Sequence, residues 1–583
     1  MSDVAADFEP GSAGSTAPGG ASDSAELGMD REGLDQVLRA LADNRARWAR
    51  LPVATRLDYV RELRQRVVDH AEEWVQVGIE HKGLDPSSPL VGSEEWLGGP
   101  YASLTWLTDM ARTLSLLDSG GDLLAGIPVR TLPNGQVAVR VQPASVVDRL
   151  FTPGATLDVW MQPGVSEWTL RDTMATFYRQ TDPSGRLLVV LGAGNYSALP
   201  FSDTLYYLFA HGDVVALKMN PVNEVFQPVL EKILQPLVRD GFVRFVCGGA
   251  EVGQYLTRHE LVEAIHITGS AATHDAVVYG TGEEGARRKA ADDPVVDKPV
   301  YSELGGVGPT IVVPGPWSRG DVAYQGDHIA SQALHNAGHA CISAQVLVLP
   351  SEWTKRHDVE QAVRAAFHAS TPRDAYYPGT RQRQDALHDH SPEAEMHGGD
   401  SRRTLLAGLD PTSDHPAFHQ ELFGPMLAST HLAGADPGEY LHNAIAFANE
   451  RLYGSLGANI LIHPATTRKL GPAFTQAIAG LRYGNIAINT WSAGIYNSAR
   501  GAWGAHPGHS RTDIQSGTGV VRNTLLFDQP QKNIIRAPFR QYPKPIWFLN
   551  NPSATPGARA FFYFLASPSP LGVMKVFAAA AQR

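Results

Sequence analysis

The sequence predicts an α/β protein with parallel, doubly wound sheets. Short apolar runs alternate with longer stretches of helical periodicity between residues 186 and 349, and this alternation is typical of βαβ units. Several of the runs end in glycine-containing turns, at the position where ligands bind in open α/β sheets. The chain has 583 residues, of which 43% are hydrophobic, so it is long enough to bury a large core.

Composition excludes several classes of protein. The formal net charge is -11 and no dense basic stretch occurs, so nucleic-acid binding is not expected. The two cysteines, Cys247 and Cys341, are too few for a disulfide framework and fit the reducing cytoplasm. Residues 1–29 lack the apolar core of a signal peptide, and we expect a disordered acidic tail there. The most apolar stretch, residues 560–581, is interrupted by Pro568, Pro570 and Lys575, so no bilayer span is expected.

The elements are predicted in chain order from their periodicity. Residues 30–82 have the pattern of two amphipathic helices. Residues 137–141 alternate like a strand, and short β-like pieces follow over residues 148–168. The remaining predicted strands are residues 186–191, 213–218, 242–247, 264–268, 310–313, 345–349 and 485–489. Two polar segments, residues 281–299 and 373–403, break the pattern and are expected at the surface.

Cys341 is the first candidate for chemistry. It ends the hexapeptide NAGHAC (residues 336–341), whose small residues and glycine suggest a turn that exposes the sulfur and directs backbone N–H groups at the thiolate. The alternative is a buried cysteine without a chemical role, and on the hexapeptide alone it is the more common case. Cys247 follows an apolar run and precedes two glycines, which indicates a core position at a sheet end.

Two polar residues beside glycines could assist a nucleophile. Glu303 precedes Leu304 and two glycines, and a partly desolvated carboxylate would serve as a general base. Asn195 follows the turn that ends the apolar run 186–191, where its amide could donate to an oxyanion. Each has an ordinary alternative, a solvated turn glutamate and an asparagine that tolerates a left-handed turn.

Two further positions follow predicted strands. Lys218 ends the run 213–218, and Gly269 and Ser270 follow the run 264–268. Both could contact a ligand at the carboxyl ends of parallel strands, although a solvated strand end and an ordinary strand-to-helix turn would look the same.

The order of these signals resembles the aldehyde dehydrogenase superfamily over residues 186–524. Gly194-Asn195-Tyr196 is similar to the motif whose asparagine helps form the oxyanion hole, and residues 213–218 to the strand whose lysine binds the adenosine ribose. The turn at Gly269-Ser270 resembles the one beneath the cofactor pyrophosphate. The remaining matches are Glu303 with its glycines as the general-base motif, residues 336–341 as the nucleophile motif, and Glu421 to Pro425 as the motif whose Glu421 holds the nicotinamide ribose and whose Phe423 lines the nicotinamide.

The resemblance implies an architecture and a reaction. It implies a Rossmann-like cofactor domain, an α/β catalytic domain and a small β oligomerisation element, placed at residues 30–307 (with the β element near 133–168) and 308–500, with residues 501–583 returning to the cofactor domain and forming a C-terminal extension. It further implies NAD or NADP as cofactor, an aldehyde as substrate, no metal ion, and a homodimer or homotetramer. Cys341 would attack the aldehyde, Asn195 and a backbone N–H would stabilise the oxyanion, and Glu303 would activate water to release the acid.

The departures from the family pattern leave alternatives open. His339 stands where the family often has Gln, and we expect it to point to solvent rather than to lower the thiol pKa. Pro221 stands where the family often has an acidic residue, with Glu224 three positions later, so the choice between NAD and NADP stays open.

The C-terminal extension and the final acyl acceptor also leave choices. The aromatic extension, residues 529–583, is expected to pack on the body or on a neighbouring subunit. A membrane-surface role is the weaker alternative, because its basic residues form no clear polar face. The rival activities are a coenzyme A-acylating dehydrogenase or acyl-CoA reductase, a catalytically silent scaffold, and a cysteine hydrolase without cofactor. Glu303 favours hydrolysis over transfer to coenzyme A, since such relatives often lack this base.

Overall fold

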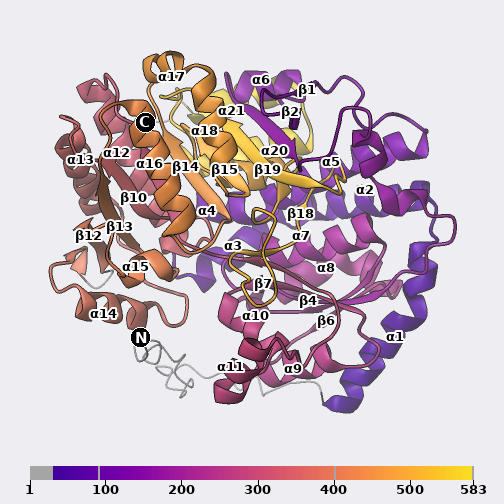
Figure 1. Cartoon of the computed structure of the whole chain (residues 1–583). Coiled ribbons are helices and arrows are strands. Elements are labelled where there is room, and N and C mark those ends of the chain that lie inside the picture. Colours follow the sequence, from indigo (N-terminus) through magenta and orange to yellow (C-terminus); the bar gives the residue numbers. More distant parts are fainter. Residues whose placement is uncertain (1–29, 89–91, 400–401, 581–583) are drawn as a thin grey trace.

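The computed structural model describes residues 30–88, 92–399 and 402–580. Its strands form one sheet of eleven strands and one of six, both flanked by helices (Figure 1). This is the predicted α/β class with parallel sheets. The predicted acidic tail, residues 1–29, lies outside the described residues.

The six-stranded sheet has the order β17-β8-β7-β4-β5-β6. Its strands are β4 (Leu187–Leu191), β5 (Val214–Lys218), β6 (Val243–Val246), β7 (Ala264–Gly269), β8 (Val300–Leu304) and β17 (Gly517–Thr518). All neighbours run parallel except β17, which pairs antiparallel with β8. The four strands predicted between residues 186 and 268 are confirmed. Because they are parallel, their carboxyl ends meet along one edge.

The connections of this sheet are mainly helical. They include α7 (Ala198–Tyr206), α8 (Gln227–Arg239), α9 (Ala250–Arg258) and α10 (Ala271–Val278). The apolar faces of α8 and the buried strands belong to one core cluster. Such burial on both faces explains why the strands read as continuous apolar runs.

The eleven-stranded sheet has the order β1-β2-β3-β19-β15-β14-β9-β10-β13-β12-β11. Its central strands include β9 (Gly308–Val312), β10 (Ala344–Pro350) and β15 (Asn485–Ile488), which confirm the three remaining strand predictions. The others on this side are β11 (Glu395–His397), β12 (Arg403–Leu409), β13 (Met426–Leu432) and β14 (Gly457–Leu461).

The expected oligomerisation element pairs within the chain. Strands β1 (Val129–Thr131), β2 (Val137–Gln142) and β3 (Thr156–Met161) form an antiparallel meander. Strand β19 (Pro530–Arg536) lies between β3 and β15 and joins this meander to the eleven-stranded sheet. The β-like pieces expected from residue 148 are wrong in part, because α6 (Val146–Phe151) occupies the first of them. Ser145 caps this helix by accepting the N–H of Asp148, an arrangement that favours a helix start.

The N-terminal segment forms three helices instead of the two predicted. They are α1 (Arg31–Ala49), α2 (Val53–Asp69) and α3 (Ala71–His81). Pro52 separates the first two, as expected of a residue tolerated at a helix start, and the chain leaves helical geometry again at His70 (φ -107°, ψ 8°).

The two polar segments differ in their exposure. Residues 281–299 contain α11 (Gly282–Ala291), which is largely exposed as predicted. Residues 373–403 contain α14 (Thr380–His390), and here the surface prediction is wrong for the first part. The side chain of Arg373 is 10% exposed and Thr380 is 1% exposed, because residues 373–380 pack against the segment that carries Cys341.

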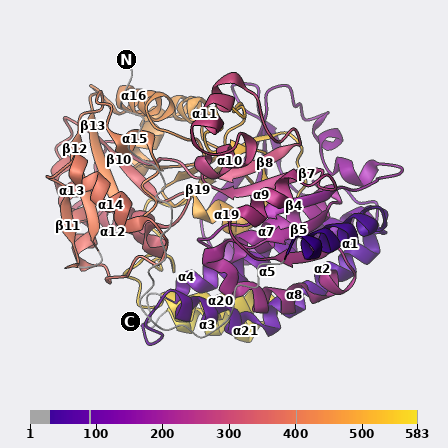
Figure 2. The same ribbon diagram turned by 90° about the horizontal axis from the view of Figure 1, so that it is seen from below.

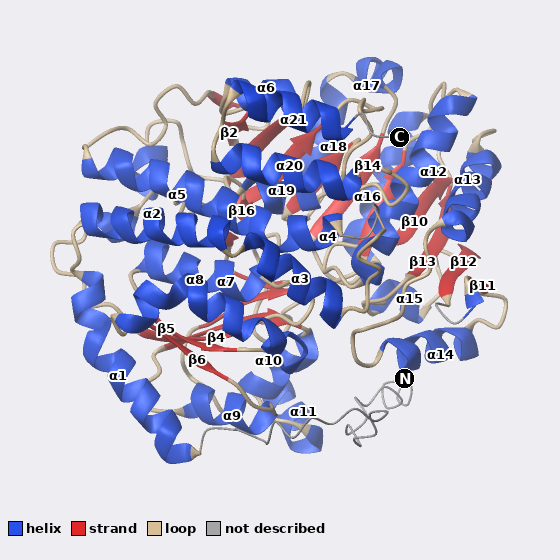
Figure 3. Cartoon of the chain, turned by 180° about the vertical axis from the view of Figure 1, so that it is seen from behind, coloured by secondary structure: helices blue, strands red, loops and turns tan. Residues whose placement is uncertain are grey.

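The C-terminal extension packs on the body, which confirms the first of the predicted placements. Helix α20 (Ala554–Ala566) contacts α4 (Ser93–Trp96), α5 (Ala102–Asp118) and α21 (Pro570–Ala580). Figure 2 shows α20 and α21 beside α3 and α4, and the view from behind in Figure 3 shows α21 beside α6, where the rings of Phe577 and Phe151 stack. Within the described ranges, no helix is both long and apolar enough to cross a membrane.

Candidate active site

Cys341 follows a tight turn that ends helix α12 (Arg319–Leu334). Asn336 and Ala337 both have φ 53°, a left-handed conformation that costs a residue other than glycine about 1 kcal/mol or more. Gly338 completes the turn, and a Cβ there would lie 2.0 Å from the carbonyl oxygen of Gly424. The turn therefore needs a glycine at this point, and the surroundings must hold the two strained residues before it.

Glu303 lies beside the thiol of Cys341. It is on β8, where its register partner on β7 is Thr268. The carboxyl is 3% exposed, hydrogen-bonds with the thiol, and accepts the indole N–H of Trp503 over 3.2 Å. Burial, reinforced by the nearby charge of Asp203, raises the pKa of Glu303 to about 7. The predicted partly desolvated carboxyl is thus present, with a pKa suited to base catalysis near neutral pH.

The thiol of Cys341 is not the stabilised thiolate that the sequence suggested. Burial, followed by the carboxyls of Glu303 and Glu421, raises its pKa well above the usual range, and the backbone N–H of Cys341 itself offsets only a small part. Desolvation of the sulfur explains most of the difference, and the two carboxyls add to it because like charges disfavour a second anion. At neutral pH Cys341 is therefore a protonated thiol, hydrogen-bonded with the carboxyl of Glu303.

Asn195 is held against the same turn. It is 5% exposed, and its side-chain N–H₂ donates to the carbonyl of His339 over 3.1 Å. Its own carbonyl accepts from the amide of Asn336 at 3.1 Å and from the hydroxyl of Tyr376 at 3.0 Å. The bonds made within the described residues use one of the two amide hydrogens of Asn195, which leaves a donor next to Cys341.

His339 is buried, and the prediction that it points to solvent is wrong. Its exposure is 0%, and its Nε2 lies 2.8 Å from the hydroxyl of Thr380. Burial lowers the pKa of His339 to about 3, so the ring is neutral and adds no positive charge beside the thiol. Residues 373–380, which were expected at the surface, shield the His339 ring from solvent.

Glu421 and Phe423 reach the site from the loop between α15 (Pro416–His419) and β13. A Cβ at Gly305 would lie 2.0 Å from Oε1 of Glu421. The Glu421 carboxyl therefore packs against Gly305, the residue that directly follows strand β8 with Glu303. Burial raises the pKa of Glu421 to about 8. The Phe423 ring lies 5.4 Å from the ring of His339.

Lys218, Gly269 and Ser270 lie elsewhere, on the carboxyl edge of the six-stranded sheet. Lys218 is 7% exposed, and desolvation lowers its pKa. Gly269 and Ser270 are exposed, and the hydroxyl of Ser270 caps α10 by accepting from Thr273. The structure places these three positions at the ends of β5 and β7, on either side of β4, and does not bring them to Cys341.

The donor set fits a dinucleotide. Oε1 of Glu421 is buried and has no hydrogen-bond partner among the residues that the structure describes, so it is an acceptor left available for ribose hydroxyls. Lys218 supplies a donor at the sheet edge, and a Cβ at Gly194 would lie 2.8 Å from Oδ1 of Asn220, so the Asn220 side chain packs against this glycine. An extended ligand along this edge would meet Lys218 at one end and Glu421 at the other.

Cys247 has no comparable surroundings. It follows β6 at the sheet end, as predicted, but it is only half-buried. Its thiol donates to Gln227, and burial raises its pKa to about 11. Across the described ranges, no group of three or more His, Cys, Asp or Glu side chains is arranged to hold a metal ion.

The sequence did not predict two buried partners in the site, Trp503 and Asp203. Trp503 lies in the glycine-rich segment 501–519, which resembled the family only loosely, so nothing marked its indole as a donor to Glu303. Asp203 is 0% exposed and accepts from the hydroxyl of Thr268 over 2.7 Å. The polar run Ser202-Asp203-Thr204 inside the otherwise apolar helix α7 was the available signal for it.

Comparisons with known proteins agree with this arrangement. Residues 162–381 match the profile of the aldehyde dehydrogenase family. The NADP/NAD-dependent aldehyde dehydrogenase PuuC of Escherichia coli is 25% identical over 44% of this chain and 49% of its own length. A 1-pyrroline-5-carboxylate dehydrogenase of Bacillus pumilus is 26% identical over 48% and 54%. The chain therefore spans about half the length of the curated relatives it matches.

Solved structures extend the likeness to most of the fold. An NAD-dependent aldehyde dehydrogenase from Sinorhizobium meliloti aligns with a TM-score of 0.59 at 16% identity, over 88% of this chain and 89% of that one. Aldehyde dehydrogenase AldC of Pseudomonas syringae, solved as a mutant with NAD+ and octanal, aligns with a TM-score of 0.56 at 18% identity, over 87% and 89%. The chain therefore has the fold of these aldehyde dehydrogenases, and residues 162–381 are similar to the aldehyde dehydrogenase family profile.

Proposed function

We propose that the protein oxidises an aldehyde to a carboxylic acid with NAD or NADP, through a covalent intermediate on Cys341. One observation carries the proposal: Cys341, Glu303 and Glu421 come from three distant segments, and each perturbs the pKa of another. A thiol, a base with a pKa near 7 and an acceptor for ribose hydroxyls are the parts that this reaction needs.

The first step follows from the resting protonation state. As the sulfur of Cys341 attacks the aldehyde carbon, a C–S bond forms and the thiol proton passes to the Glu303 carboxylate. The carbonyl oxygen becomes an oxyanion, which the free amide hydrogen of Asn195 would stabilise. The high pKa of the thiol makes this proton transfer a requirement, which gives Glu303 a role in addition to the predicted activation of water.

The second half of the reaction releases the acid. Glu421 would hold the ribose of a bound nicotinamide and Phe423 would lie beside its ring; the cofactor would accept the hydride, which leaves a thioester on Cys341. Glu303 first releases to solvent the proton that it took from the thiol. It then takes a proton from water, the water oxygen bonds to the acyl carbon, and the C–S bond breaks with that proton passing to sulfur. The indole of Trp503 keeps one oxygen of Glu303 oriented throughout.

The preferred cofactor is NAD, because Glu224 supplies a carboxylate at the adenosine end. It accepts the backbone N–H of Gly248 over 3.0 Å, and its charge is the carboxylate that acts most strongly on Lys218. A carboxylate in this place favours a ribose 2′-hydroxyl and repels a 2′-phosphate. Glu224 therefore substitutes for the acidic residue that Pro221 replaces.

The rival functions fit fewer observations. Transfer of the acyl group to coenzyme A needs no base, whereas Glu303 is buried, oriented and in contact with the thiol. A silent scaffold has no physical need for an unpartnered buried acceptor at Glu421 beside such a pair. A cysteine hydrolase without cofactor leaves Lys218 and Glu421 unexplained.

The remaining proposals concern location and assembly. We place the protein in the cytoplasm and expect a homodimer or homotetramer, although the β-element completes a sheet within its own chain. Strand β1 leaves an edge to which a second copy could add. Analytical ultracentrifugation of the purified protein decides between monomer, dimer and tetramer.

An aldehyde panel tests the proposed reaction. Purified protein is incubated with aldehydes of increasing chain length, with each of the two cofactors, and with or without coenzyme A. We expect reduced NAD and free carboxylic acid without coenzyme A, and no turnover by Cys341→Ser. The proposal fails if no aldehyde yields reduced cofactor under any of these conditions. A product found only with coenzyme A would favour the acylating alternative.

A further inference from the structure

A group of buried charges lies on the far side of the Cys341 turn from Glu303. Lys82 and Glu95 pair over 2.7 Å, with side-chain exposures of 2% and 4%. Arg373 pairs with Glu94, whose side chain is 1% exposed. None of these four residues takes part in the proposed reaction. Buried ion pairs cost desolvation and are weak evidence of stability, so their placement calls for another explanation.

Both ion pairs meet at Asn336, the first strained residue of the turn. Lys82 Nζ donates to the side-chain oxygen of Asn336 over 3.0 Å, and the backbone N–H of Asn336 donates to Glu94. The side-chain nitrogen of Asn336 in turn donates to the carbonyls of Asn195 at 3.1 Å and His339 at 3.0 Å. One left-handed residue thus links the charges to the oxyanion donor and to the chain that enters Cys341.

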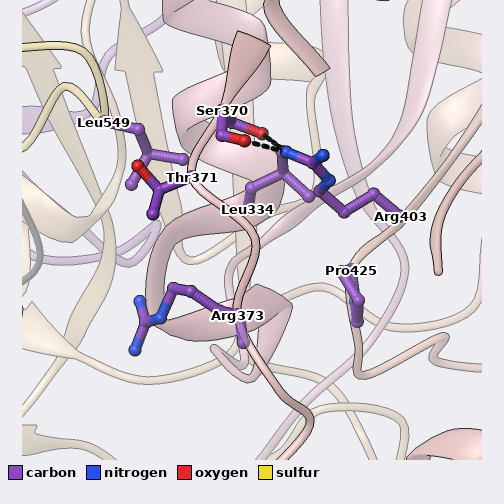
Figure 4. A pocket seen from close by; sticks show the side chains of 8 residues that line it. Leu334, Ser370, Thr371, Arg373, Arg403, Pro425 and Leu549 are labelled. Atoms are coloured by element: carbon purple, nitrogen blue, oxygen red, sulfur yellow. Dashed lines mark hydrogen bonds between the residues drawn. The ribbon is translucent and has the colours of Figure 1, made fainter. Parts of the chain in front are cut away.

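The hydroxyl of Tyr376 provides a second link between Asn336 and Asn195. It accepts from the side chain of Asn336 at 2.9 Å and donates to the carbonyl of Asn195 at 3.0 Å. Arg373 lies three residues earlier and lines a small cavity beside Ala337 and Leu334 (Figure 4). In this view the guanidinium of Arg373 extends away from that of Arg403, which bonds to Ser370. The segment 373–376 therefore reaches the turn through both a charge and a hydroxyl.

Helices α3 and α20 pack against the short helix α4, which carries two of these charges, Glu94 and Glu95. A Cβ at Gly78 on α3 would lie 2.2 Å from Oε2 of Glu95, so α3 presses closely on this carboxyl. On the outer side of α4, the ring of Trp96 lies 5.3 Å from that of Phe562 in α20. The C-terminal extension thereby supports the short helix that carries Glu94 and Glu95.

We propose that the paired charges Lys82–Glu95 and Glu94–Arg373 are positioning residues, which hold Asn336 in its left-handed conformation and so set the geometry of Cys341 and Asn195. The inference rests on the proposed function in taking Cys341 as the nucleophile. It adds residues from the N-terminal helices and from residues 373–376, which no motif assigned. A displacement of about 1 Å in such a site costs about 100-fold in rate, so a loosened turn would be visible in kcat.

A paired substitution separates positioning from stability. Lys82→Met/Glu95→Met replaces the ion pair by apolar side chains of similar length, an exchange that folded proteins often tolerate. The matched control is Arg364→Met/Glu395→Met, which removes a partly exposed pair at 2.6 Å remote from the turn. The measurements are the thermal midpoint, the Kd for NAD, kcat and KM for the aldehyde, and the rate of Cys341 alkylation by iodoacetamide against pH, followed by peptide mass spectrometry.

We expect kcat to fall and the rate of Cys341 alkylation to rise. In Lys82→Met/Glu95→Met, kcat falls by about 10- to 100-fold while the Kd for NAD changes less than about twofold. Alkylation of Cys341 at pH 7 becomes about tenfold faster, because a loosened thiol is less desolvated, so its pKa falls and its thiolate fraction grows. The control changes neither quantity. An unchanged kcat together with an unchanged alkylation profile overturns the proposal.

A second variant covers the case in which the first does not fold. Tyr376→Phe removes only the hydroxyl that bridges Asn336 and Asn195, and kcat should fall several-fold with an unchanged thermal midpoint. No loss of kcat and no change of the alkylation profile in this variant overturns the proposal. Alkylation needs neither aldehyde nor cofactor, so it tests the positioning of Cys341 even if the panel of aldehydes fails and the proposed function is wrong.

Discussion

Trp503→Phe should move the pH dependence of turnover to higher pH. The indole N–H of Trp503 bonds Oε1 of Glu303 over 3.2 Å and lowers the pKa of that carboxyl, which other effects raise to about 7. Removing the donor disfavours the carboxylate, so the pKa rises. Glu303 must be ionised to accept a proton, and the rising limb of activity therefore shifts in the same direction.

The size of the shift follows from the bond. Hydrogen bonds to charged groups contribute about 1.5–3 kcal/mol, and 3.2 Å is longer than the usual charge-assisted distance of about 2.7–2.9 Å. The lower end of the range corresponds to about one pH unit, since one unit of pKa equals about 1.36 kcal/mol. A midpoint near pH 7 should move to about pH 8, with the rate at pH 7 falling to about a fifth of the wild-type rate and the rate recovering at pH 9.

The assay is the initial rate of cofactor reduction at saturating substrate from pH 5.5 to 9.5. The control is Trp160→Phe, a buried tryptophan whose indole N–H has no partner among the residues described. Its removal should leave the midpoint in place. An unshifted midpoint in Trp503→Phe, or a shift to lower pH, would refute the role of Glu303 as the titrating base.

Further substitutions test the other parts of the site. Asp203→Asn removes a charge that raises the pKa of Glu303, so the rising limb should move to lower pH, opposite to Trp503→Phe; a shift upward contradicts the electrostatic account. Glu421→Gln should weaken NAD binding by about tenfold, the equivalent of about 1.4 kcal/mol, as measured by calorimetry, and unchanged binding would remove Glu421 from the cofactor site. Glu224→Gln should improve kcat/KM for NADP relative to NAD by about tenfold or more, and an unchanged ratio assigns the discrimination to another group.

The strands and the order of the site motifs were predictable from the sequence because both are local. Buried parallel strands read as apolar runs whatever lies around them, and residues 186–191 and 345–349 needed no further information. A polar helix start such as Ser145 is a weaker signal, and the β-like residues around it were misassigned. Helix α3 was not predicted as a separate helix, because the chain leaves helical geometry only at His70, which carries no proline or glycine signal.

The surroundings of the nucleophile could not be predicted, because they come from distant segments. His339 is neutral and buried only because residues 373–380 fold over it, and that segment is polar enough to suggest a surface. Lys82 and Asn336 lie 254 positions apart, and neither belongs to a hydrophobic pattern. The raised pKa of Cys341 likewise comes from burial and from two carboxyls that meet the thiol only in the fold.

The most direct test of the account is the mass of Cys341 in Glu303→Gln after mixing with an aldehyde and NAD. At pH 7 this variant should form neither adduct nor acid, because the thiol has lost its proton acceptor. At pH 9.5 the thiolate forms without the base while water activation is still missing, so rapid acid quenching and peptide mass spectrometry should find the acyl group accumulated on Cys341 and not on Cys247. Wild-type protein under the same conditions should release free acid. An acyl group on Cys247, or normal acid release by Glu303→Gln with no adduct, would contradict the proposed roles of Cys341 and Glu303.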